Sequence, residues 1–145
     1  MGSRVGSRAE FRAIRERVGA SRQFLADKLG VAERSVKRWE DPRYAEPPQD
    51  AWALLYGMLE SQRRMIDSAL DLAEDMIEKA GREPAAFRLN YYRSQNQYEI
   101  AGRDDGDYNI ANANARAVAT ALDAMGYSVE WAYPDEEGYT DTPRN

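Results

Sequence analysis

The chain has 145 residues, of which 43% are hydrophobic and 31% charged, a composition typical of a folded globular protein and not of a disordered one. Cysteine and histidine are both absent, which excludes disulfides, zinc enzymes and Ser-His-Asp hydrolases. We therefore expect no enzyme, no cofactor and no metal. The sequence has neither a signal peptide nor an apolar run of the roughly 18 residues that span a bilayer, so we expect a cytoplasmic protein without a membrane partner.

The net charge of −5 conceals an uneven distribution. Residues 1–48 hold eleven basic and seven acidic side chains (net +4), whereas residues 49–145 hold nine basic and eighteen acidic ones (net −9). A basic N-terminal part and an acidic C-terminal part are typical of a nucleic-acid-binding module joined to a part with another role. A chance distribution of solvated charges is the alternative.

The spacing of apolar residues predicts three short helices over residues 11–19, 21–30 and 33–40. Ser21 is a good N-cap, Gly19 and Gly30 are C-terminal stops, and Pro42 ends the third helix, so that residues 41–48 form a loop. The glycine turn between the second and third helices is helix-turn-helix geometry. We expect Trp39 to seal one small core that is formed by Leu25, Leu29, Val31 and Val36.

Residues 49–80 are predicted to be helical almost throughout, either as one helix or broken at Gly57 or within 61–64. Two strands are predicted over 86–92 and 127–133, and an Ala-rich helix over 109–125. Residues 94–100 are ambiguous, 102–106 form a loop, and 134–145 form a flexible acidic tail. The fold class is therefore mainly α with a small β element.

The third predicted helix carries a basic face. Glu33, Arg34, Lys37 and Arg38 share one stripe, opposite Val36 and Trp39. Such a face suits the major groove of DNA, because arginine can bind guanine bidentately and glutamate can accept from cytosine. We assign the four stripe residues to base contacts, and Ser21, Arg22, Ser35 and Arg43 to contacts with the DNA backbone. The alternative is a solvated helix, and binding of RNA by the same face also stays open.

The segment SRQFLADKLGVAERSVKRWED resembles the xenobiotic-response-element/Cro type of helix-turn-helix regulator. Eight positions match the pattern of that family, and Val36 is a conservative replacement; the matching residues are Ser21, Leu25, Ala26, Leu29, Gly30, Val31, Trp39 and Glu40. The resemblance covers residues 11–48 and implies that Arg22 contacts the DNA backbone or a base, and that Glu33, Arg34 and Arg38 read bases, with Lys37 nearby.

The segment departs from the family pattern in three places. Ala32 replaces the usual serine or threonine N-cap, a loss of ~1 kcal/mol. Asp41 and Pro42 replace the glycine after Glu40, and the next proline comes one residue late, at Pro47. The two changes after Glu40 predict another path for the loop that carries Arg43.

The layout of the whole chain is also similar to that of the anti-CRISPR-associated autorepressors of phages, on segments such as PPQDAWALLYGML and PAAFRLNYY. This second resemblance implies a C-terminal part that makes a dimer, in a bacterial or phage-infected cell.

Aromatic residues gather in the acidic half of the chain. Two isolated strands make too little sheet to be stable, so we expect them to pair across a two-fold axis. The alternative is that this half completes one monomeric core. The predicted dimer interface consists of Phe87, Leu89, Tyr91, Val129, Trp131 and Tyr133.

These observations predict a helix-turn-helix domain over residues 9–60, a connecting helix over 61–84, a small α+β dimerisation domain over 85–133 and a tail over 134–145. The predicted function is that of a dimeric transcriptional regulator, a repressor or autorepressor, which binds an inverted repeat in double-stranded DNA. The alternative is an antitoxin-like or adaptor protein whose acidic half binds a protein and whose DNA binding serves autoregulation.

Overall fold

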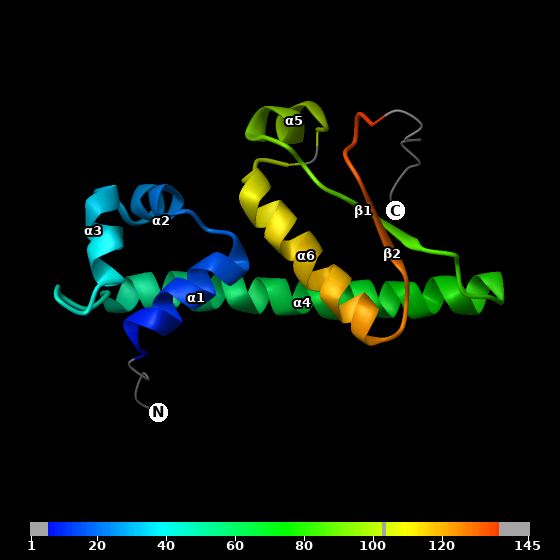
Figure 1. Ribbon diagram of the computed structural model, residues 1–145, viewed down its shortest axis with the longest axis horizontal. Coiled ribbons are helices and arrows are strands. Elements are labelled where there is room, and N and C mark those ends of the chain that lie inside the picture. The colour runs from blue at the N-terminus through cyan, green and yellow to red at the C-terminus, as the bar shows by residue number, and fades with distance from the viewer. Residues whose placement is uncertain (1–5, 103, 137–145) are drawn as a thin grey trace. The chain divides into compact units, whose positions relative to one another are not determined.

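The computed structural model describes residues 6–102 and 104–136 and is mainly helical (Figure 1). Residues 137–145 of the predicted tail, and Arg103 of the predicted 102–106 loop, lie outside the described residues. The chain divides into two compact units, Met1–Gln62 and Arg63–Asn145. In chain order the elements are α1 (Arg8–Val18), α2 (Arg22–Leu29), α3 (Glu33–Trp39), α4 (Gln49–Ala80), β1 (Phe87–Asn90), α5 (Gln95–Ile100), α6 (Tyr108–Ala124) and β2 (Val129–Ala132).

Capping residues fix the helix ends of the first unit. Ser7 accepts a hydrogen bond from the Glu10 amide, so α1 begins three residues before the predicted start. The Ser21 hydroxyl caps α2 in the same way, through the Phe24 amide. Gly30 follows α2 with φ of 69°, a left-handed conformation that turns the chain sharply into α3.

The first unit is built around one buried core. Phe11, Leu25, Val36 and Leu55 are fully buried, and the Phe11 ring meets the Trp52 ring edge-on at 5.1 Å between centroids. The expectation that Val31 joins this core is wrong, because Val31 is exposed. It lies in the connection between α2 and α3, where its amide donates to the Ala26 carbonyl.

Helix α4 is one continuous helix and is broken neither at Gly57 nor within residues 61–64, the two places at which the sequence allowed a break. The polar residue Gln62 is fully buried, and its side chain exchanges two hydrogen bonds with Arg17: Gln62 Nε2 donates to the Arg17 carbonyl (3.1 Å), and Arg17 Nε donates to Gln62 Oε1 (3.0 Å). Because the side-chain oxygen and nitrogen of Gln62 are both hydrogen-bonded, this polar residue can lie in the core and α4 needs no break here. In the described part of the chain, no helix combines the length and apolar character that a membrane span requires.

The second unit holds a two-stranded parallel sheet. Strand β1 pairs with β2 in the register Phe87↔Val129 to Asn90↔Ala132, so the two strands pair within one chain and not across a two-fold axis as expected. A parallel pair needs a long crossover connection, here supplied by α5 and α6 (Figure 1). The segment left ambiguous by the sequence is α5, which the Ser94 hydroxyl caps through the Gln97 amide.

Candidate nucleic-acid interface

The short helix α3 has one buried and one exposed face. Val36 and Trp39 are buried in the core of the first unit. The residues assigned to base contacts are all exposed, as their spacing predicted: Glu33, Arg34, Lys37 and Arg38. The buried face fixes the orientation of the helix, so the charged face points to solvent.

Three of these four residues line a hollow with the start of α2. The hollow encloses about 360 Å³, and its walls are Glu33, Arg34, Lys37 and Arg22. Three cations against one carboxylate make this surface basic. The structure thus brings together side chains that the sequence had assigned separately to base and backbone contacts.

Arg22 is held in place by a buried carboxylate. Its Nε and Nη2 atoms donate to Glu40 Oε1 at 3.3 and 3.1 Å. Arg15 donates two hydrogen bonds to the same carboxylate, from Nε to Oε2 at 2.5 Å and from Nη2 to Oε1 at 3.1 Å. The Glu40 side chain is only 3% exposed. One carboxylate therefore balances two guanidinium groups, and a surplus positive charge remains.

This ion-pair network was not predicted from the sequence. Arg15 and Glu40 lie 25 residues apart, so no local pattern joins them. One signal was present in the sequence, because Arg15 occupies the helical position four residues after the buried Phe11. A charged residue on the core face of a helix needs a buried partner.

Arg38 and Arg43 both lie close to an aromatic ring in the loop after α3. Their guanidinium carbons are 5.1 and 5.7 Å from the centroid of the exposed Tyr44 ring. These are cation–π distances. Tyr44 was not among the predicted site residues, although an aromatic residue beside Arg43 in a polar loop could have indicated it.

Arg43 is exposed but paired. Its side chain donates three hydrogen bonds to the Asp41 carboxylate, at 2.6, 3.1 and 3.1 Å. The Arg43 hydrogen bonds lower the pKa of Asp41 to about 2. Arg8 holds the loop itself, because Arg8 Nη1 donates to the carbonyls of Asp41 and Ala45 at 3.1 and 3.2 Å. At Arg43 the positive charge is thus offset by its neighbour.

The two serines assigned to the DNA backbone differ in position. Ser21 is exposed at the start of α2, where its hydroxyl serves as the helix cap. Ser35 is half-buried within α3, and its amide donates to the Ala32 carbonyl at 2.9 Å. Ser21 lies next to Arg22 in the chain, whereas Ser35 is less accessible than the basic residues around it.

The residues predicted for the dimer interface fall into two groups. Phe87, Leu89 and Val129 are half-buried in the core of the second unit, where they pack against a cluster formed by Ala73, Val118 and Leu122. Those contacts are intramolecular, so these three residues offer less surface to a second copy than the sequence suggested.

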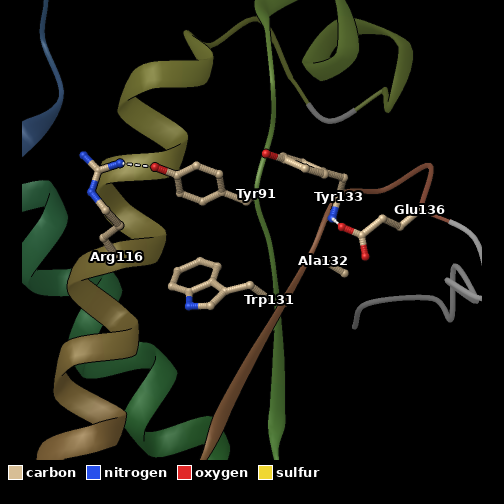
Figure 2. A pocket seen from close by; sticks show the side chains of 6 residues that line it. All are labelled: Tyr91, Arg116, Trp131, Ala132, Tyr133 and Glu136. Atoms are coloured by element: carbon tan, nitrogen blue, oxygen red, sulfur yellow. Dashed lines mark hydrogen bonds between the residues drawn. The ribbon is translucent and has the colours of Figure 1, made fainter.

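The remaining residues predicted for the dimer interface line a hollow in the second unit. These are Tyr91, Trp131 and Tyr133, which enclose about 420 Å³ together with Arg116, Ala132 and Glu136 (Figure 2). Arg116 Nη1 donates to the Tyr91 hydroxyl at 2.6 Å, and the rings of Tyr91 and Trp131 meet edge-on at 5.4 Å. Trp131 is exposed, and Tyr133 is half-buried.

Comparison of the chain with models of known protein families gave no match, and a search of curated proteins gave no significant match either. The assignment of function therefore depends on the geometry and the charges described above.

Proposed function

We propose that this protein is a sequence-specific DNA-binding transcription regulator in which α2, residues 30–32 and α3 form a helix-turn-helix. The observation that carries the proposal is the exposed charged face of α3, backed by the buried Val36 and Trp39. In this arrangement α3 enters the major groove and α2 crosses the DNA backbone.

The chemistry of this face supports base reading. Arg34 and Arg38 each offer a planar fork of donors that fits guanine O6 and N7, and Lys37 adds a third cation. Glu33 can accept from the amino group of cytosine. Arg22 shares the hollow with Arg34 and is already oriented by Glu40, which suits a contact to a phosphate at the edge of the groove.

One seven-residue recognition helix contacts only a few base pairs. The protein therefore binds as a homodimer to an inverted repeat. The two half-sites are then one turn of DNA or a whole number of turns apart, in steps of about 10 bp from centre to centre. The protein acts as a repressor, with its own promoter as one expected target, in the cytoplasm of a bacterial or phage-infected cell. The acidic second unit keeps away from the DNA and supplies the dimer contact.

Selection of bound sequences from random duplex DNA, with the full chain, tests the proposal. We expect an enriched palindromic site. On that site Arg34→Ala and Arg38→Ala each weaken binding by ~1–3 kcal/mol and relax the preference at one base pair. The matched control is Arg12→Ala, which removes an exposed arginine of α1 and leaves the base preference unchanged. No enriched sequence, or equal behaviour of Arg34→Ala and the control, would refute the proposal.

A protein-binding adaptor is the second candidate function, and the exposed Trp131 beside the hollow of the second unit favours it. In that case Trp131→Ala abolishes binding of a purified partner encoded by a neighbouring gene and leaves DNA affinity unchanged. If Trp131→Ala leaves binding of every such partner unchanged, this candidate is rejected.

A further inference from the structure

An exposed apolar stripe runs along the second half of α4. Met65, Leu72 and Met76 are 45%, 48% and 47% exposed, and the partly buried Ala69 lies between them. The spacing 65, 69, 72, 76 is the four-three-four repeat of a coiled-coil seam. We call these four residues the outer seam.

The outer seam lies beside the face of α4 that serves the chain's own core. Ala69 is the one seam residue that also packs against the hydrophobic cluster of the second unit, to which α4 contributes Ile66, Leu70 and Ala73 as well. At 100° per residue they lie on a stripe beside the outer seam, turned by roughly a quarter of a turn around the helix. This part of α4 therefore has one partnered apolar stripe and a second one that the single chain leaves largely exposed.

We infer that the outer seam binds the outer seam of a second copy of this chain, with the two α4 helices antiparallel. This inference rests on the homodimer of the proposed function and names the surface that forms it. It differs from the interface expected from the sequence, because three of the six residues expected there lie in the protomer's own core.

The order of side chains along the seam favours a second copy in the antiparallel direction. A two-fold axis between residues 70 and 71 places Met65 opposite Met76, and Ala69 opposite Leu72. Each apolar side chain then meets an apolar side chain of the other copy, and the small Ala69 leaves room for the larger Leu72. In a parallel pair Ala69 faces Ala69 and leaves a gap, while Leu72 crowds against Leu72.

The charges beside the seam are consistent with the same direction. Arg64 and Asp75 are exposed and lie at nearly the same angle around the axis of α4, on the side of the helix turned away from the core residues. An antiparallel pair brings these sides of the two helices together, so that Arg64 of one copy comes next to the partner's Asp75. Lys79 Nζ, 3.0 Å from Asp75 in the same helix, leaves a carboxylate oxygen for this contact.

Sedimentation equilibrium of the full chain gives the first test. We expect a dimer that Leu72→Glu weakens by at least ~100-fold, because two charges become buried opposite small alanines. The matched control is Ile100→Glu, which places the same charge on α5 at a position that is 77% exposed, and it leaves the dimer intact. A wild-type monomer at 50 μM, or equal behaviour of the two variants, would overturn the inference.

Cross-linking tests the direction and does not depend on the Leu72→Glu variant folding. The chain has no cysteine, so single cysteines can be introduced without background. We expect a short bis-maleimide to join a Met65→Cys chain to a Met76→Cys chain in an equal mixture, and to leave either variant alone un-cross-linked. Two copies of residue 76 are about 16 Å apart along the antiparallel pair. Self-cross-linking of each single variant would indicate a parallel pair and reject the inference.

The cross-linking is done without DNA, which separates this inference from the proposed function. Cross-links of the expected pattern, together with no enriched DNA site, uphold the seam and reject the regulator. An enriched palindromic site together with no cross-link upholds the regulator and rejects the seam.

Discussion

Neutralising the buried Glu40 should strongly destabilise the first unit. Glu40→Gln keeps the size of the side chain but removes its charge, and it leaves the guanidinium of Arg15, which is 9% exposed, without a balancing anion. Breaking a buried ion pair in this way costs ~3–5 kcal/mol. Arg22 is 29% exposed and is screened by water, so it adds little to this figure.

Urea unfolding followed by tryptophan fluorescence measures the effect, because Trp39 and Trp52 lie in the core of the first unit. With an m-value of ~1–3 kcal/mol/M, the midpoint should fall by more than about 1 M. The matched control is Glu16→Gln, which breaks an exposed pair with Arg12 and changes stability by less than about 0.5 kcal/mol.

A compensated variant tests the physical reason. Arg15→Met combined with Glu40→Leu removes both members of the buried pair and should recover most of the lost stability, because well-packed apolar residues can replace such a pair. If Glu40→Gln shifts the midpoint no more than Glu16→Gln does, the network is not stabilising and the reasoning fails.

Three further predictions concern smaller effects. Ala32→Ser supplies the cap that α3 lacks and should raise the free energy of unfolding by ~1 kcal/mol, measured by urea titration. The pKa of Asp41 is lowered from its ordinary value of 3.8 to about 2 by Arg43, so the stability from this pair is complete above pH 3.8 and is lost as the pH falls through about 2. In Arg43→Gln, the pKa of the Asp41 carboxyl, followed by NMR titration, should move back toward 3.8, and an unchanged titration would contradict this origin of the shift. Asn112→Ala removes the two buried hydrogen bonds that join Asn112 to the amide and the carbonyl of Tyr92 and should cost ~2–4 kcal/mol; a loss below about 1 kcal/mol, measured by thermal unfolding, would contradict this estimate.

Helix ends were predictable where one residue fixes them. Gly30 and Ser21 act through their own backbone and side chain, so α2 ends and begins where the sequence indicated. The exposure of Arg34 and Lys37 also followed from spacing alone, because Val36 between them is the residue that enters the core. These features depend on neighbours within one or two helical turns.

Features that join distant residues were not predictable from the sequence. The pairing of β1 with β2 brings together residues that lie on either side of two helices, and each short strand alone was equally compatible with a partner in another chain. The same holds for Glu40, whose two arginine partners come from different helices. In the candidate site, the charged face and the buried residues behind it could be predicted, but the ion pairs through which Glu40 holds Arg22 could not.

The parallel pairing of β1 and β2 also has a consequence during synthesis. Arg88 and its partner Glu130 are 42 residues apart. At a translation rate of ~5–20 residues per second, β1 leaves the ribosome roughly 2–8 s before the strand that completes its sheet. The first unit ends at Gln62 and can fold in that interval, while the nascent second unit still carries an open β edge that a chaperone or another nascent chain can meet.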